Sequence, residues 1–480
     1  MSEISPPDFD LAIIGSGGGA FAAAIKATNL GKRVVMIERG TVGGTCVNTG
    51  CIPSKSLLAA ADARHVALDS NRFPGINTSA DPVDMQVLIG GKGDLIETMR
   101  ADKYVDLIGE YGWELRHGDA AFVGTPTDPL LEVTDADGTV ETVRAAHYLV
   151  ATGSSPWVPS IDGLQEVDYL TSTTAMELDE VPESLLVLGG GYVALEQAQL
   201  FARLGSKVTM VVRSRLASSE EPEASRALMS VFADEGIRVL RETTVSTVRT
   251  DAATGEVVAL VSGIGGREGI RASKLLVATG RRPVTEGLNL AAVGVTTGEE
   301  GEVAVSAMLA SSNSRIWAAG DVTGHPEFVY VAASHGSLVV DNAFNDAARE
   351  VDYRHLPRVT FTTPNLAAVG MTDKQARDAG ILCECRVLPL EYVPRALVNR
   401  DTRGFIKIVA DTHTGLIVGV TAVAQNAGEI AAAAGYIVSA GMTVTQVANL
   451  WSPYLTMAEG IKIACQSFNT DVAKLSCCAS

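Results

Sequence analysis

The chain lacks the features of several protein classes. None of its 480 residues lies in a run of about 18 consecutive apolar residues, the length a membrane-spanning helix needs. The N-terminal segment MSEISPPDFD has no apolar stretch typical of a signal peptide, so we expect a cytoplasmic protein. The net charge of −18 shows no excess of cations, which argues against binding to nucleic acid or anionic membranes. Apolar residues make up 46% of the chain, which suits a globular protein of several domains.

The cysteines do not form the even set of a disulfide-stabilised secreted domain. There are seven: Cys46, Cys51, Cys383, Cys385, Cys465, Cys477 and Cys478. In a reducing compartment, catalysis or metal binding is the better expectation for some of them. Cys383 and Cys385 face one side of a probable strand with no further ligand pair nearby in the sequence, so we expect them to pack rather than to bind zinc. Cys465 stands among apolar residues at helical spacing, which predicts a core position.

Two segments of the sequence each show a short apolar run, a glycine-rich turn and an alanine-rich helical pattern. The first begins near Phe9 and the second near Ser184, and each returns to another apolar run, KRVVMIE and SKVTMVV. A β-α-β unit that occurs twice predicts two Rossmann-like nucleotide-binding domains. Apolar and polar residues alternate over 110–150, which predicts antiparallel strands. Residues after 355 predict an α+β domain with a hairpin at 404–423, followed by helices at 427–440 and 457–468.

The first glycine-rich turn fits the dinucleotide-binding pattern G-x-G-x-x-G/A. Gly15 permits the tight turn, Gly17 lets the backbone approach a pyrophosphate, and Ala20 permits close packing of helix on strand. The N-terminus of the following helix then faces the anion. Glu38 ends the second strand, where a carboxylate can accept hydrogen bonds from a ribose.

The second turn repeats the pattern with Gly189, Gly191 and Ala194, but its second strand does not end in an acid. Arg213 follows that strand and Arg215 is close by. Cationic side chains at this place suit a 2′-phosphate, which favours NADPH over NADH. The alternative is that both arginines are only solvated.

The segment GGTCVNTGCIPSK places Cys46 and Cys51 five positions apart at the start of a probable helix. If the intervening residues form the first turn, the two sulfurs can meet in a disulfide. A helix N-terminus also lowers the pKa of a thiol, which favours the thiolate at neutral pH. Two such thiols can accept or release two electrons, so we expect a redox-active pair.

With this segment, the two fingerprints, ATG at 151–153, ATGRRP at 278–283 and AAGDV at 318–322, the chain resembles the pyridine nucleotide-disulfide oxidoreductase family over essentially its whole length. The resemblance implies an α/β fold with two Rossmann-like domains, for FAD and NADPH, and a C-terminal α+β domain that forms a homodimer. The implied boundaries are 1–155 for the FAD domain, 156–281 for the NADPH domain, 282–355 for a segment completing the FAD domain, and 356–480 for dimerisation.

The resemblance also implies roles for single residues. Cys51 resembles the thiol next to the flavin, and Cys46 resembles the thiol that exchanges with substrate. Lys55 resembles the lysine beside flavin N5, and its implied partner is Glu196 in GYVALE. A lysine there would stabilise negative charge on the reduced flavin.

Two further positions have implied roles at the cofactors. Tyr192 resembles the aromatic residue that covers the flavin until nicotinamide displaces it. A core aromatic is the alternative, but its place directly after the glycines favours the gate. Asp321 in AAGDV resembles the acid that binds the ribityl chain. The same motifs add three expected FAD-binding residues: Thr45, Gly153 and Gly320.

The chain departs from the disulfide reductases of the family near its C-terminus. Glutathione reductase and dihydrolipoamide dehydrogenase carry a His-Pro-Thr-x-x-Glu segment, whose histidine protonates the leaving thiol. The segment that resembles it here is SPYLTMAEG. This segment keeps Thr456 and Glu459 but has Tyr454 in place of the histidine. A phenol with a pKa of ~10 is a poor proton exchanger at neutral pH. A metal ion held by thiolates needs no such proton donor.

The second departure is the adjacent pair Cys477 and Cys478 in KLSCCAS. Two soft sulfurs on a flexible tail suit Hg(II), and family members that reduce this ion have a similar tail. The resemblance therefore implies that Hg(II) arrives as a thiol complex and passes from this pair to Cys46 and Cys51 of the other subunit, where NADPH and FAD reduce it to Hg(0). Tyr454 would shape the metal's path. A thioredoxin reductase or another disulfide reductase of the family is the alternative.

Overall fold

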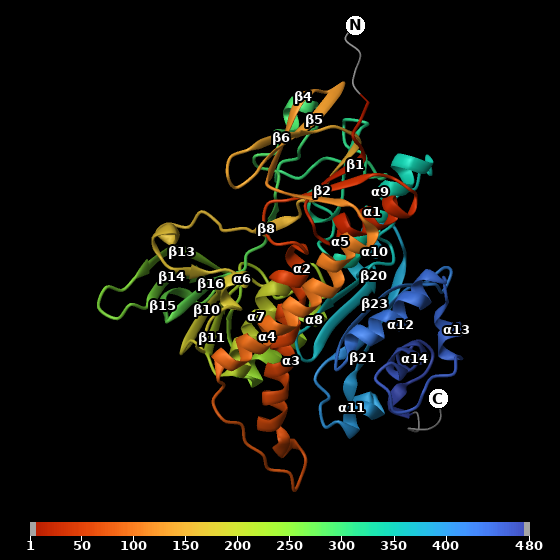
Figure 1. Cartoon of the computed structure of the whole chain (residues 1–480). Coiled ribbons are helices and arrows are strands. Elements are labelled where there is room, and N and C mark those ends of the chain that lie inside the picture. The colour runs from red at the N-terminus through yellow and green to blue at the C-terminus, as the bar shows by residue number, and fades with distance from the viewer. Residues whose placement is uncertain (1–5, 475–480) are drawn as a thin grey trace. The chain divides into compact units, whose positions relative to one another are not determined.

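The structure is a computed structural model that describes residues 6–474 (Figure 1). The chain divides into two compact units. Each unit is assembled from three separate stretches of chain. The first contains Met1–Ser56, Val87–Trp157 and Gly280–Val351. The second contains Leu57–Gln86, Val158–Thr279 and Asp352–Ser480.

The first unit is built on a five-stranded parallel sheet in the order β18-β7-β1-β2-β3. The strands are β1 (Phe9–Ile14), β2 (Val34–Glu38), β3 (Glu114–His117), β7 (Ala145–Val150) and β18 (Ile316–Ala318). Leu11 and Ile13 of β1 face α1 (Gly18–Asn29) and α9 (Val329–Asn345), while Ala12 and Ile14 point to the other face. All four side chains are buried, which is typical of a parallel sheet covered on both sides.

Antiparallel strands cover the second face of this sheet. β4 (Asp119–Thr125), β5 (Asp128–Thr134) and β6 (Val140–Val143) form a meander whose Phe122 and Leu131 pack against β1 and β7. The predicted antiparallel strands over 110–150 are thus confirmed for the meander. They are wrong for β3 and β7, which join the parallel sheet instead. A short ribbon pairs β8 (Ser154–Pro156) with β17 (Arg281–Pro283).

The second unit contains another parallel sheet, in the order β12-β11-β10-β16-β9. Its strands are β9 (Tyr169–Leu170), β10 (Ser184–Leu188), β11 (Lys207–Val211), β12 (Arg238–Leu240) and β16 (Lys274–Val277). Two helices accompany it, α7 (Tyr192–Leu204) and α8 (Pro222–Asp234). An antiparallel sheet adds β13 (Thr243–Thr250), β14 (Val257–Gly263) and β15 (Gly266–Ala272). The two predicted β-α-β units are therefore confirmed.

The C-terminal part of the second unit is an antiparallel sheet in the order β19-β20-β23-β22-β21. Its strands are β19 (Pro357–Thr360), β20 (Asn365–Gly370), β21 (Cys383–Pro389), β22 (Phe405–Asp411) and β23 (Ile417–Ala424). The helices α12 (Ala427–Ser439) and α14 (Glu459–Gln466) pack on it, and Ile406 and Ile408 lie in the shared core. The predicted hairpin and both predicted helices are confirmed, and Cys465 is fully buried as expected.

The remaining α-helices lie in the segments between the strands or after the last one. They are α2 (Gly44–Asn48), α3 (Cys51–Leu68), α4 (Met85–Arg100), α5 (Asp106–Tyr111), α6 (Ser172–Ala175), α10 (Asp373–Asp378), α11 (Pro394–Val398) and α13 (Val444–Ala448). Among residues 6–474, none of the helices combines the length and apolarity needed to cross a bilayer.

Candidate active site

The first glycine-rich turn has the geometry of a dinucleotide site. Gly15 has φ +102°, and a Cβ atom there would lie 2.4 Å from the carbonyl oxygen of Ala151, so only glycine fits. A Cβ atom on Gly17 would meet nothing closer than 3.9 Å, which leaves the backbone open to a ligand. Gly17 caps α1 without a side-chain hydrogen bond, so the first-turn N–H groups can receive an anion, and Ala20 is fully buried against the sheet.

The carboxylate of Glu38 is held in place at the end of β2. One oxygen accepts a hydrogen bond from the backbone N–H of Gly40 (2.7 Å), and the other accepts one from the hydroxyl of Ser16 (2.6 Å). The Ser16 hydroxyl also accepts from the backbone N–H of Gly43 (3.1 Å). Ser16 therefore links Glu38, the residue expected to bind the ribose, to the loop that carries the cysteines. Sequence reasoning missed this residue, although it stands between the two fingerprint glycines.

The cysteine loop packs directly against the nucleotide turn. Gly44 has φ +65°, and a Cβ atom there would lie 2.5 Å from the Cα atom of Gly17. Any side chain at Gly44 would therefore push the two loops apart. This contact explains the glycine directly before Thr45, which is exposed at the start of α2.

We expected the two cysteines to share one helical turn, but they do not. Cys46 lies in the short helix α2, Cys51 begins α3, and Thr49 and Gly50 lie between the helices. The two thiols nevertheless come into hydrogen-bond contact. Cys51 is exposed, whereas Cys46 is partly buried.

The expected lowering of the thiol pKa is wrong for Cys46. Its hydrogen bond to Cys51 raises the pKa of the Cys46 thiol, and burial and the charge of Cys51 raise it further, while Lys55 acts in the opposite direction. The contact therefore keeps a proton on Cys46, because two neighbouring thiolates repel each other. Tyr104 is a neighbour that the sequence did not reveal. Burial, and then the charges of the two cysteines, raise the pKa of its phenol.

Asp321 lies in a polar cluster at the 3-10 turn Gly320–Thr323. Its carboxylate accepts a hydrogen bond from the hydroxyl of Ser154 (2.8 Å). The guanidinium of Arg281 donates to the hydroxyl (2.7 Å) and to the carbonyl oxygen (2.6 Å) of Ser154. Ser154 directly follows Gly153, which has φ +70°, so three of the quoted motifs, ATG, ATGRRP and AAGDV, meet here.

A buried histidine supports the same turn. The backbone N–H of Gly320 donates to Nδ1 of His335 (3.2 Å), so this nitrogen must be unprotonated. Burial, and then the charge of His325, lower the pKa of His335 to about 4. The side chain is therefore neutral at physiological pH.

The second glycine-rich turn repeats the geometry of the first. Gly189 has φ +130°, and a Cβ atom there would lie 2.2 Å from the carbonyl oxygen of Ala278. Gly191 has open space around the position of a Cβ atom, and Ala194 is fully buried. The second turn can therefore hold a pyrophosphate in the same manner.

The two arginines expected at the 2′-phosphate differ in their surroundings. The guanidinium of Arg215 donates to four main-chain carbonyl groups between residues 217 and 221, at 2.6 to 3.4 Å. Through these bonds, the guanidinium of Arg215 stabilises its own loop. Arg213 is exposed beyond the end of β11 and is the better candidate to meet a phosphate.

Tyr192 begins α7 and is anchored by a buried ion pair. Its hydroxyl donates to the carboxylate of Glu220 (2.8 Å), which also binds the guanidinium of Arg358 at 2.8 and 3.0 Å. Burial, and then the negative charge of Glu220, raise the pKa of Tyr192 to about 12. No sequence pattern pointed to Glu220 or Arg358, because they lie in different segments.

Glu196 is another anchored side chain of α7. Glu196 is 7% exposed, and its carboxylate accepts a hydrogen bond from the backbone N–H of Phe361 (2.9 Å). The expected pairing of Glu196 with Lys55 would join the two units and stays a prediction.

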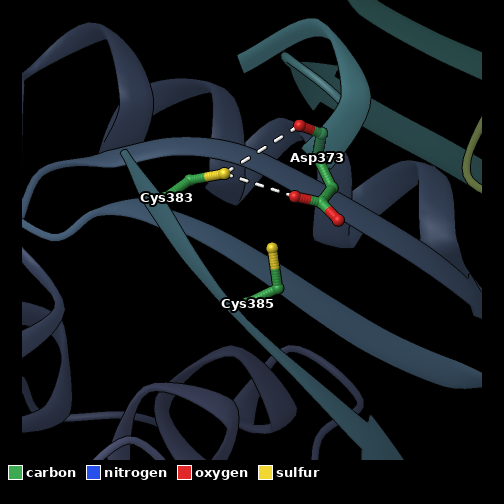
Figure 2. Close-up of side chains that lie close together, drawn as sticks. All are labelled: Asp373, Cys383 and Cys385. Carbon is green, nitrogen blue, oxygen red and sulfur yellow. Dashed lines mark hydrogen bonds between the residues drawn. The ribbon is translucent and has the colours of Figure 1, made fainter. Parts of the chain in front are cut away.

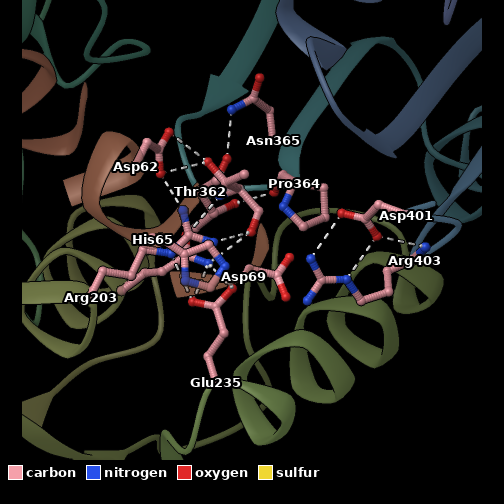
Figure 3. Close-up of polar contacts among 12 residues, drawn as sticks. Asp62, His65, Asp69, Arg203, Glu235, Thr362, Pro364, Asn365, Asp401 and Arg403 are labelled. Carbon is pink, nitrogen blue, oxygen red and sulfur yellow. Dashed lines mark hydrogen bonds and ion pairs between the residues drawn. The ribbon is translucent and has the colours of Figure 1, made fainter. Parts of the chain in front are cut away.

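Arg203, near the end of α7, belongs to a buried network of polar side chains (Figure 3). Its guanidinium binds the carboxylate of Glu235 at 2.6 and 2.9 Å, the carboxylate of Asp62, and the carbonyl oxygen of Thr363 at 3.1 Å. Gln199, one turn earlier, also donates to Glu235. These bonds fix the far end of the helix that Tyr192 begins.

Tyr454 lies on an exposed turn before α14, with 49% of its surface accessible. The backbone N–H of Leu455 donates to Glu459 (3.1 Å), and the backbone N–H of Glu459 donates to the hydroxyl of Thr456 (3.2 Å). The two residues kept from the family motif thus shape the turn that presents Tyr454. Cys477 and Cys478 lie outside the described residues.

Comparisons with known proteins cover nearly the whole chain. Residues 9–336 match the pyridine nucleotide-disulphide oxidoreductase family, and residues 356–465 match the dimerisation domain of that family. The chain is 59% identical to a mercuric reductase of Streptomyces lividans over 98% of both chains. It is 46% identical to a mercuric reductase of Staphylococcus aureus over 98% of this chain and 84% of that protein.

Solved structures show the same fold at lower identity. The Cu(II) complex of the HOCl-induced flavoprotein disulfide reductase RclA from Escherichia coli is similar, with a TM-score of 0.85 and 26% identity. That similarity covers 96% of this chain and 99% of the other. LpdA from Mycobacterium tuberculosis has a TM-score of 0.84 and 26% identity over 96% of this chain and all of that chain.

Proposed function

Because the chain belongs to the pyridine nucleotide-disulphide oxidoreductase family, we propose that it uses NADPH and FAD to reduce Hg(II) to Hg(0). The mercuric reductases among its relatives support the substrate, and the match to the dimerisation domain supports a homodimer. The observation that carries the proposal is the contact between the Cys46 and Cys51 thiols, on a loop packed against the first dinucleotide turn. Two soft sulfurs held together there can bind Hg(II) and transfer two electrons.

The residues of the first site fit FAD. The open backbone at Gly17 and the N-terminus of α1 suit the pyrophosphate, Glu38 suits the ribose, and Asp321 can accept hydrogen bonds from the ribityl chain. A bound flavin would supply two-electron transfer between the nicotinamide and the thiol pair. Arg281 and Ser154 hold Asp321 in position, and Lys55 contributes positive charge beside the cysteines.

The second site suits NADPH. Gly191 leaves room for the pyrophosphate, and the exposed Arg213 can bind the 2′-phosphate, while Arg215 stabilises the loop around it. Tyr192 stands directly after Gly191 and must move before the nicotinamide can bind where its ring lies. Its movement breaks the hydrogen bond to Glu220, so this bond sets the balance between the closed and open positions.

The substrate step needs no proton donor. Hg(II) bound by the sulfurs of Cys46 and Cys51 takes two electrons and leaves as Hg(0), and both sulfurs remain on the protein. A tyrosine at position 454 is therefore compatible with the reaction, since no thiol leaving group must be protonated. The C-terminal cysteines 477 and 478 would pass Hg(II) to this pair in the other subunit by exchange between thiolates.

The test measures NADPH oxidation together with release of mercury vapour, with Hg(II) supplied in excess small thiol. We expect Cys46→Ser and Cys51→Ser to abolish vapour release, while Cys465→Ala, which changes a buried core cysteine, retains it. Cys477→Ser with Cys478→Ser should lower the rate when Hg(II) is scarce. Rapid reduction of thioredoxin, with Hg(II) acting only as an inhibitor, would instead identify a disulfide reductase.

A further inference from the structure

Three potential metal ligands meet at one edge of the C-terminal sheet (Figure 2). Cys383 and Cys385 project from the same side of the edge strand β21, and Asp373 is the first residue of α10. One carboxylate oxygen and the two sulfurs all lie within 4.8 Å of one another. The sequence offered these cysteines no further ligand pair, and the structure adds a single carboxylate. A carboxylate ten residues before the first cysteine becomes their neighbour because the chain turns back after α10.

The spacing of the three ligand atoms is close to what one ion requires. A zinc ion binds sulfur at about 2.3 Å and carboxylate oxygen at about 2.0–2.2 Å, so the ligand atoms of a tetrahedral site lie about 3.5–3.8 Å apart. The observed separations of up to 4.8 Å reach this range when rotations of the side chains bring the ligand atoms closer by up to about 1 Å. All three residues are partly exposed, so an ion can reach them from solvent.

The contacts within the cluster hold its members in this arrangement. The thiol of Cys383 donates to the carboxylate of Asp373 at 3.2 Å. The backbone N–H of Asp373 donates to Glu221 at 2.7 Å, and a capping box formed by Thr372 fixes the start of α10. The carboxylate is thus presented to the strand before any ion binds.

Two cations also face the cluster. The guanidinium of Arg377 binds the Asp373 carboxylate at 2.9 Å, and the charge of Lys407 on the neighbouring strand acts on both Asp373 and Cys385. Lys407 is already paired with Glu221 at 2.9 Å. Arg377 is 67% exposed and can turn towards solvent when an ion takes its place.

We propose that Asp373, Cys383 and Cys385 form a second metal site that binds a borderline-soft divalent cation of the Zn(II) type. Two thiolates and one carboxylate supply three ligands, and a water molecule completes a tetrahedron. Binding releases the two thiol protons to solvent and changes no oxidation state. The ion fastens α10 to the edge of the sheet, and the site shares no residue with the redox pair, which belongs to the other unit.

The experiment uses the FAD-loaded enzyme with its Cys46–Cys51 pair oxidised, in a Cys477→Ser/Cys478→Ser background. Neither of the other thiol pairs can then bind metal. Titration calorimetry with Zn(II) in buffers of different ionisation enthalpy should show one ion bound per chain and proton release. Cys383→Ser, Cys385→Ser and Asp373→Asn should each lose the binding. Asp378→Asn, which removes an exposed carboxylate of the same helix, should retain it.

A second measurement needs no substitution at the site. Bound Zn(II) should protect Cys383 and Cys385 from alkylation, as detected by peptide mass spectrometry. Hg(II) added afterwards should displace the bound Zn(II), because Hg(II) is softer and prefers thiolates. Absence of a bound ion, or binding that survives all three substitutions, would overturn the proposal. Mercury reduction by Cys383→Ser should equal that of the parent enzyme, so failure here is distinguishable from failure of the proposed function.

Discussion

The hydroxyl of Tyr192 offers the sharpest test of the proposed gate. Tyr192→Phe removes the hydrogen bond to Glu220 but leaves that carboxylate paired with Arg358, so no buried charge is orphaned. A hydrogen bond to a charged group contributes a net ~1.5–3 kcal/mol. The closed position of the ring should lose that stabilisation.

The consequence is a higher population of the open position. Since each 1.36 kcal/mol corresponds to a factor of ten, the ratio of open to closed should rise roughly 10- to 150-fold. Apparent affinity scales with the fraction of competent protein, so NADPH should bind more tightly by up to that factor, until the open form dominates. Anaerobic stopped-flow measurement of flavin reduction against NADPH concentration gives the apparent dissociation constant.

Two further variants make the measurement specific. Glu220→Gln keeps an acceptor but removes its charge, and a neutral hydrogen bond contributes ~0.5–1.5 kcal/mol, so its effect should be smaller than that of Tyr192→Phe. Tyr436→Phe removes an exposed hydroxyl from α12 and should change nothing. An apparent NADPH affinity for Tyr192→Phe that equals or falls below that of the wild type would refute the gate.

Two other predictions concern the stability of the fold. The pKa of His335 is lowered to about 4, so the unfolded chain binds a proton that the folded chain does not between about pH 6.5 and 4. The free energy of unfolding should fall by on the order of 3 kcal/mol as the pH drops through this window. Urea unfolding of His335→Gln should show a shallower fall, and an equal fall in both proteins would contradict this. Arg203→Met leaves the carboxylate of Glu235 buried without its guanidinium and should cost about 3–5 kcal/mol. Adding Glu235→Gln should recover most of that loss in thermal unfolding, and a double variant as unstable as the single one would disprove the charge argument.

Local constraints made the nucleotide-binding turns predictable. Gly15 and Gly189 have positive φ, which glycine adopts without strain, so the backbone of each turn by itself requires glycine. The alternation of apolar and polar residues likewise revealed the meander and the C-terminal hairpin. It could not separate β3 and β7 from the meander, because strands of similar composition can pair with either sheet.

The fold class and the two dinucleotide fingerprints follow from the sequence alone, because short-range sterics and periodicity specify them. The sequence also paired Cys46 with Cys51, but it did not reveal that they lie on two separate helices. Other features required the tertiary structure: the anchoring of Tyr192 by Glu220 and Arg358, the use of Arg215 within its own loop, and the approach of Asp373 to two cysteines. The first and the last depend on where separate segments meet, and the second depends on the path of the loop after β11. Such meetings depend on the packing of whole strands and helices, and nothing in the neighbouring sequence encodes them.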